Sequence, residues 1–222
     1  MGRQTAAYTA PFLVFILFSA LASLLDNIRP SAGGVGAIYL IFPLQTVVCG
    51  VLLAYYWRDY RLARPRKAWL AATVGLVVFF LWISPQAILH TTPRLNGFDP
   101  DVFATHPHLY WCEMLLRLLR LTIVVPLLEE IFWRGFLLRY LEHENFQDTP
   151  FGAYSPKANI LVAIAFMLEH AYLDMPAALV AGFLYNTVAY RTRSLSSCVL
   201  AHALTNALLG AYIITTKQWG FW

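Results

Sequence analysis

Residues 124–136 read VVPLLEEIFWRGF, an apolar run that contains Glu129, Glu130 and Arg134. The run belongs to a longer apolar stretch at about 111–139, which is long enough to cross a bilayer as a helix. A charged side chain near the bilayer centre costs about 2.5 to 3.5 kcal/mol on insertion scales. Three such side chains therefore predict compensating partners or a function, on the interior side of a helical bundle and not on its lipid face.

The whole chain shares this apolar character. Of its 222 residues, 59% are hydrophobic and 13% are charged, against about 25% charged in a typical soluble domain. Backbone groups in lipid must be hydrogen-bonded within the protein, so each membrane span is predicted to be a helix. We predict an all-α fold, a polytopic transmembrane helical bundle of about seven to eight spans with a polar interior cavity. Seven spans are expected at about 5–25, 36–57, 68–89, 111–139, 157–174, 175–190 and 195–216.

The net charge of +4 comes mostly from basic residues in short links between apolar runs. This distribution is typical of a membrane topology signal, so no nucleic-acid partner is expected. The link YWRDYRLARPRK at 56–67 contains five basic residues and is the strongest cytoplasmic marker. Counting alternate crossings from this link places the N-terminus on the cytoplasmic side as well. The same count places four basic residues inside, namely Arg139, Lys157, Arg191 and Arg193. It places Arg29 and Arg94 outside.

Several other features are given structural interpretations. The first apolar run, PFLVFILFSALASLL at 11–25, lacks a convincing cleavage site and is predicted to be a transmembrane helix, not a signal peptide. The polar segment at 90–111 is expected to be an interfacial loop or partial helix, and WCEMLLRLLRL at 111–121 an interfacial amphipathic turn. Small residues four apart in the sixth span predict close helix packing; they are Ala177, Ala178, Ala181 and Gly182.

Potential metal ligands are weighed against simpler roles. The three cysteines, with no CxxC pair among them, are interpreted as packing residues; they are Cys49, Cys112 and Cys198. His90, His106 and His108 lie in a proline-broken segment and are expected to be solvated and not to bind a metal. No metal or cofactor is therefore predicted from these residues.

The polar residues of three spans are predicted to meet. Glu130 and Arg134 are one helical turn apart and can form an ion pair, which leaves Glu129 without a local cation. Two later spans each carry polar or aromatic residues four apart, at similar depth; these are Phe166 with His170, and His202 with Asn206.

A carboxylate and an imidazole in a wet pocket can deprotonate water, and a second imidazole and an amide can stabilise an oxyanion. Together these groups are the parts of a peptide hydrolase. Each residue also has a simpler interpretation: the glutamate–arginine pair as a structural ion pair, and the histidines and asparagine as interhelical contacts. Glu169 is ranked below Glu129, as a supporting residue, a loop-end charge or an alternative acid.

The ordered set EExxxR, FxxxH and HxxxN resembles the CPBP family, the CAAX protease and bacteriocin-processing (Abi) family of intramembrane glutamate proteases. The resemblance covers residues of about 110–216, the expected catalytic core of a single membrane domain at 1–222, with accessory spans at 1–109. It implies that Glu129 and His170 activate water, and that His202 and Asn206 stabilise the oxyanion. Glu130, Arg134 and Phe166 would support the site, without an essential metal.

The resemblance also implies a substrate and a location. We expect cleavage near the C-terminus of a membrane-associated or lipid-modified protein, in the bacterial inner membrane, with the lipid bilayer as the other partner. The layout is also similar to the CAAX prenyl protease-related branch that occurs with exosortase sorting systems. Two alternatives stay open: a non-proteolytic immunity or scaffolding protein, and a proton-coupled transporter, for which repeated halves are expected and none is seen.

Overall fold

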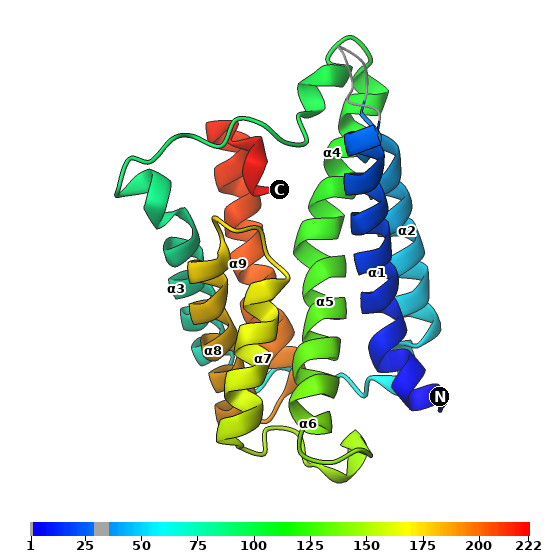
Figure 1. Cartoon of the computed structure of the whole chain (residues 1–222), viewed down its shortest axis with the longest axis vertical. Coiled ribbons are helices and arrows are strands. Elements are labelled where there is room, and N and C mark those ends of the chain that lie inside the picture. Colours follow the sequence, from blue (N-terminus) through cyan, green and yellow to red (C-terminus); the bar gives the residue numbers. More distant parts are fainter. Residues whose placement is uncertain (1, 29–35) are drawn as a thin grey trace.

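A computed structural model describes residues 2–28 and 36–222 and shows a bundle of helices with no β-strand in the part described (Figure 1). Arg29, which was expected on the outer side, lies outside the described residues. The predicted all-α fold class is confirmed. The helices are α1 (Arg3–Ile28), α2 (Ile38–Tyr55), α3 (Ala68–Ala87), α4 (Pro107–Leu119), α5 (Val125–Glu130), α6 (Leu138–Tyr140), α7 (Pro156–Leu168), α8 (Met175–Thr192) and α9 (Leu195–Thr216).

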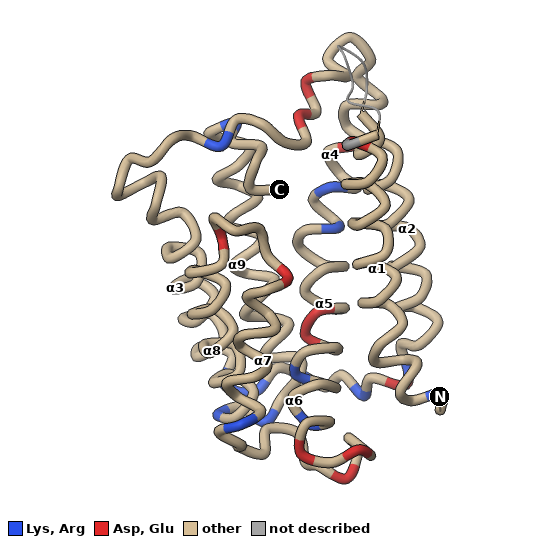
Figure 2. Tube along the Cα trace, in the orientation of Figure 1, with Lys and Arg blue, Asp and Glu red and all other residues tan. Residues whose placement is uncertain are grey.

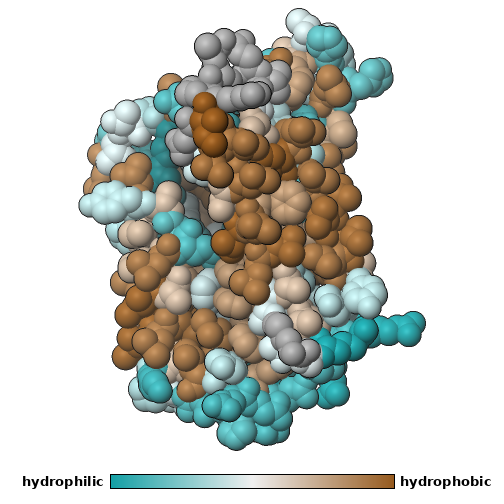
Figure 3. Space-filling view, turned by 45° about the vertical axis from the view of Figure 1, so that its right-hand side comes forward, coloured by the Kyte–Doolittle hydropathy of each residue, from teal (hydrophilic) through white to brown (hydrophobic). Residues whose placement is uncertain are grey.

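Four of the described helices are long and apolar enough to cross a membrane: α1, α2, α3 and α9. Helix α7 is apolar but shorter. The space-filling view shows a broad apolar surface around the middle of the molecule and hydrophilic residues at its lower end (Figure 3). These features describe an integral membrane protein, in which the apolar exterior faces lipid tails.

Helices α4, α5 and α6 are consecutive parts of one long rod, joined by two π-helical segments, η3 (Arg120–Val124) and η4 (Ile131–Leu137). Pro126 explains the first of them, because proline has no N–H and cannot donate to a carbonyl of the preceding turn. The amide of Val125 already bonds to Arg120, five residues back. Short π segments are frequent at functional sites, and these two flank Glu129 and Glu130.

The start of the long rod differs from the predicted amphipathic turn, because α4 continues without a break into η3. Arg117 and Arg120 are buried inside the bundle. The Arg117 guanidinium lies 4.6 Å from the Phe42 ring centre, and that of Arg120 lies 4.7 Å from the same ring. Cation–π contacts of this kind stabilise a guanidinium inside a bundle, and the sequence of a single helix cannot show them.

The fifth predicted span, 157–174, is shorter than expected. Helix α7 ends at Leu168, and a turn leads into α8 at Met175. The close packing predicted from small residues is confirmed. Ala178, Ala181 and Gly182 are buried, and the backbone of Gly182 lies directly against Ala163 of α7.

Replacement of Gly182 with alanine is expected to destabilise the protein by about 1 to 3 kcal/mol, because an added Cβ would lie 2.9 Å from the Ala163 Cα. Thermal unfolding in detergent measures the effect. Gly50→Ala in α2 is the matched control, since nothing lies within 4 Å of its Cβ position. Equal stability of the two variants would contradict the close packing of α7 on α8.

Candidate active site

A cavity of about 330 Å³ lies among α1, η3, α5, α8 and α9 and the turn after α7. At about 30 Å³ per molecule it has room for roughly ten waters. All four residues predicted to be catalytic line it, and so does Phe166; the four are Glu129, His170, His202 and Asn206. Side chains from three separate predicted spans thus share one hollow in the bundle.

Glu130 lies behind this cavity and is fully buried. Its Oε1 atom accepts two hydrogen bonds, from Nη1 of Arg134 at 3.0 Å and from Nδ1 of His202 at 3.0 Å. A carboxylate oxygen can only accept, so Nδ1 of His202 carries a proton and donates it in this hydrogen bond. The ring of His202 is also stacked on Tyr185, with centroids 5.1 Å apart. Glu130 therefore fixes the tautomer and Tyr185 the plane of the imidazole.

The Arg134 side chain is completely buried, and each of its nitrogens has a partner. Besides the bond to Glu130, Nε donates to Oδ1 of Asn186 at 3.1 Å and Nη2 donates to the Gly182 carbonyl at 3.2 Å. Asn186 in turn donates to Asn159 on α7. Because a buried cation is tolerated only when it is paired and hydrogen-bonded, this set of contacts holds η4 against α8.

The FxxxH spacing suggested that His170 lies on the helix. Instead it lies just beyond the end of α7. Its Nδ1 is 2.8 Å from the carbonyl oxygen of Phe166. A carbonyl can only accept, so Nδ1 carries the proton, and in the neutral ring Nε2 is the nitrogen with a free lone pair. The four-residue spacing therefore brings the imidazole within hydrogen-bond distance of the Phe166 carbonyl, which orients the ring. His170 also lines the cavity.

Asn206 has a contact that the sequence did not predict. Its Nδ2 donates to the Leu121 carbonyl at 2.8 Å. In the π-helical pattern of η3 this carbonyl would accept from residue 126, which is a proline and has no N–H. Asn206 therefore satisfies a carbonyl that Pro126 leaves free, and one amide N–H remains for the cavity.

Glu129 is 5% exposed, and its Oε2 atom is buried without a hydrogen-bond partner among the described residues. The same holds for Oε2 of Glu169, which also lines the cavity. A buried polar atom without a partner is costly unless water or substrate satisfies it. In a cavity of this size, both carboxyl groups are placed to bind water.

Several residues of the site were not identified from the sequence. Thr205 receives a hydrogen bond from Tyr185 at 2.8 Å and donates to the Gly75 carbonyl on α3 at 2.9 Å, which joins three helices behind His202. Asn186 clamps Arg134, as described above. An asparagine inside an apolar span is itself a signal, since polar residues there need a partner, but its partner cannot be read from one sequence.

The part of the chain that the structure describes contains no group of three or more histidine, cysteine, aspartate or glutamate residues arranged to hold a metal ion. His90, His106 and His108 do not form such a group. Glu129, His170 and His202 line the catalytic-site cavity described above.

Comparison with known proteins identifies one family. Residues 111–208 match the family described as type II CAAX prenyl endopeptidase Rce1-like. Neither the curated proteins nor the solved structures contain a match to the chain. The matched residues include all of the cavity residues from α5, α7 and α9 that are discussed above.

Proposed function

We propose that the chain is an intramembrane endopeptidase of the glutamate type, on the premise that its residues 111–208 match the family described as type II CAAX prenyl endopeptidase Rce1-like. The observation that carries the proposal is the Glu129 carboxyl group, whose Oε2 has no hydrogen-bond partner among the residues that the structure describes and which shares a cavity with His170 and His202. The substrate is a membrane-associated or lipid-modified protein, cut near its C-terminus.

In the proposed mechanism, Glu129 and His170 activate a water molecule in the cavity. One of them takes a proton from the water as its oxygen attacks the scissile carbonyl carbon. The C–N bond then breaks, and the same proton passes to the nitrogen of the leaving amine. The products are a new C-terminal carboxyl group and a new amine, and the proton that the carboxyl group then loses ionises the amine. The bond from His170 Nδ1 to the Phe166 carbonyl keeps Nε2 available for this transfer.

His202 and Asn206 are proposed to stabilise the oxyanion of the tetrahedral intermediate. Nε2 of His202, when it carries a proton, and the remaining amide N–H of Asn206 are the donors. The buried Glu130 side chain accepts the 3.0 Å bond from Nδ1 of His202 and is itself paired with Nη1 of Arg134 at 3.0 Å, so these two residues hold the imidazole in place. Glu130 and Arg134 thereby act through His202 without touching the substrate.

Incubation of the purified protein with membrane-anchored peptides tests the proposal, with mass spectrometry to locate any new C-terminus. Cleavage of some peptide inside or near its anchored end is expected. If a broad peptide library in proteoliposomes gives no product, while a solute flux appears that depends on Glu129, the transporter alternative replaces the protease.

We further propose that the chain lies in the bacterial inner membrane with its N-terminus in the cytoplasm. Lys and Arg residues gather at the end of the bundle that holds the N-terminus (Figure 2), and such residues favour the cytoplasmic side. In a cysteine-free background, Thr105→Cys, in the loop before α4, is expected to react with a membrane-impermeant maleimide in spheroplasts. Glu144→Cys, in the loop after α6, is expected to react only after lysis. The reverse labelling pattern would show that the N-terminus lies on the periplasmic side.

A further inference from the structure

A second cavity, of about 360 Å³, lies at the end of the bundle that holds the N-terminus. Its lining comes from Tyr8 of α1, Gly135 and Arg139 of the long rod, Phe151, residues 193–196 at the start of α9, and five residues of the link after α2: Tyr60, Arg61, Ala63, Arg64 and Arg66. It shares no residue with the catalytic cavity. The proposed proteolysis therefore does not use this second cavity.

The lining contains five arginines and no acidic residue. Arg139 donates to the carbonyls of Thr149 and Gly135, so its guanidinium is engaged in holding the adjacent loop. The other four arginines are exposed and form no salt bridge within the described residues; they are Arg61, Arg64, Arg66 and Arg193. Asp59, which is near in sequence, is already bound by Arg3 at 3.1 Å. The positive charge of the pocket is thus not neutralised by the protein.

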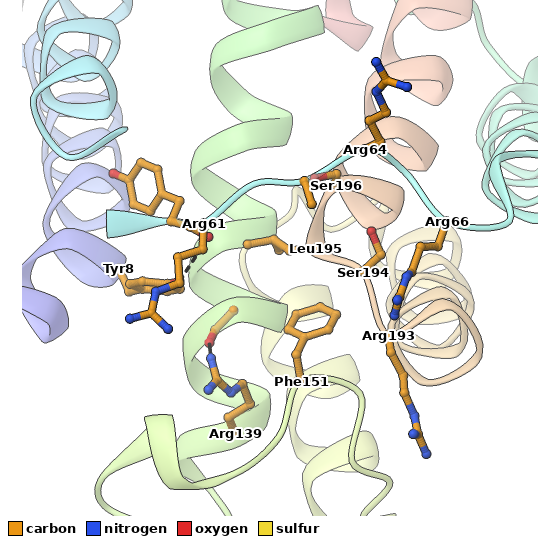
Figure 4. A pocket seen from close by; sticks show the side chains of 13 residues that line it. Tyr8, Arg61, Arg64, Arg66, Arg139, Phe151, Arg193, Ser194, Leu195 and Ser196 are labelled. Carbon is orange, nitrogen blue, oxygen red and sulfur yellow. Dashed lines mark hydrogen bonds between the residues drawn. The ribbon is translucent and has the colours of Figure 1, made fainter. Parts of the chain in front are cut away.

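Figure 4 shows how these side chains lie. Arg61 and Arg139 are on one side of the pocket, and Arg66 and the start of the Arg193 side chain are on the other. Arg64 points upward away from them, and the end of the Arg193 side chain points downward. Two of the arginines have a left-handed backbone, with φ of 50° at Arg61 and 49° at Arg193. Arg193 ends α8 at a position where glycine is usual, because a side chain makes that conformation unfavourable. The strain points to a role for the arginine side chain.

The start of α9 adds a second source of positive potential. Ser194 is the N-cap, and the residues that follow it, Leu195 and Ser196, line the pocket. The first backbone N–H groups of a helix have no partner within it and form a ready site for an anion. In this pocket they are combined with guanidinium groups, which bind phosphate oxygens with two N–H donors at once.

The depth of the pocket in the membrane identifies the source of the anion. Exposed aromatic residues flank the basic link: Tyr55 is 64% exposed, Trp57 51% and Trp69 70%. Exposed tyrosine and tryptophan residues of membrane proteins gather at headgroup level. Basic pockets between helix ends at that level bind lipid headgroups.

We propose that this pocket binds the phosphate group of an anionic phospholipid. The headgroup phosphate is held by Arg61, Arg66 and Arg193 together with the N-terminus of α9, and the acyl chains lie along the apolar exterior of the bundle. The pocket ties the link after α2, the end of α8 and the start of α9 to one ligand. A bound lipid is therefore expected to stabilise the fold.

Native mass spectrometry of the purified protein tests this with phosphatidylglycerol and phosphatidylcholine as the probes. The protein is expected to keep phosphatidylglycerol and to lose phosphatidylcholine at equal concentration. The variant Arg66→Gln/Arg193→Gly is expected to weaken phosphatidylglycerol binding about 25-fold, at about fivefold for each cation removed near the membrane surface. Glycine adopts the left-handed conformation of residue 193 without strain, so Arg193→Gly is not expected to unfold the protein. A loss of lipid binding in this variant is therefore expected to come from the missing guanidinium.

Lys157→Gln is the matched control, since Lys157 is an exposed cation at the start of α7 that does not line the pocket. It is expected to change the affinity less than twofold. An equal loss in the control and the double variant, or equal binding of the two lipids, would overturn the proposal. Inorganic phosphate at millimolar concentration is expected not to displace the lipid, and displacement would assign the site to a soluble phosphate.

Discussion

Glu129→Gln is expected to reduce peptide cleavage by about 10²- to 10⁴-fold, the contribution typical of a general base. Glutamine keeps the shape of the side chain but cannot accept the proton of the attacking water. Because Oε2 of Glu129 is buried without a partner in the described part of the chain, removing its charge is expected to leave thermal stability unchanged or slightly higher. The rate of product formation and the unfolding temperature, measured on the same preparation, separate the two effects.

Glu169→Gln is the matched control, because Glu169 lines the same cavity and its Oε2 is also buried without a partner. Its effect is expected to be less than tenfold. His170→Asn keeps an N–H for the Phe166 carbonyl but removes the basic nitrogen. It is expected to match the loss in Glu129→Gln, with little further loss in the double variant, since residues that act as a unit are not additive. A larger loss of cleavage in Glu169→Gln than in Glu129→Gln would show that Glu169, and not Glu129, is the general base.

Arg134→Met is expected to destabilise the protein by about 3 to 5 kcal/mol, because it leaves the buried Glu130 carboxylate without its cation. It also removes the hydrogen bonds to Asn186 and Gly182 that join η4 to α8. Unfolding in a detergent titration measures the loss. Arg64→Met, which removes an exposed arginine that forms no ion pair with the residues described, is expected to change stability by less than about 0.5 kcal/mol.

A double-mutant cycle shows whether the loss comes from the ion pair. Glu130→Gln/Arg134→Met is expected to be less destabilised than the sum of the two single variants, since the second change removes the unpaired charge that the first creates. Additive effects, or an Arg134→Met variant within about 1 kcal/mol of the wild type, would show that the buried pair contributes little.

Much of the fold follows from hydrophobicity along the chain. Runs of about 20 apolar residues were sufficient to predict the ranges of α1, α2, α3, α8 and α9 to within a few residues, and the small residues of α8 indicated its contact with α7. The turn at 169–174 and the π segments were not predicted. Both depend on local backbone hydrogen bonds, such as the one from the Val125 amide to the Arg120 carbonyl, that hydropathy does not register.

The candidate site could be predicted in part for a physical reason. Charged residues in apolar spans are costly, so Glu129, Glu130 and Arg134 stand out, and four-residue spacing indicates which neighbours share a helix face. Contacts between helices that are distant in sequence do not follow from spacing. The bonds from Arg134 to Asn186, from His202 to Glu130, and from Asn206 to Leu121 all belong to this class.

The most direct test of the central claim is a comparison of C-terminal peptides from the membranes of cells with the wild-type protein and cells with Glu129→Gln at equal abundance. If Glu129 activates water for proteolysis, at least one membrane-associated protein ends earlier in the wild-type cells and keeps its C-terminal extension in the variant. Identical C-termini in the two membrane proteomes, with both proteins folded, would contradict the account.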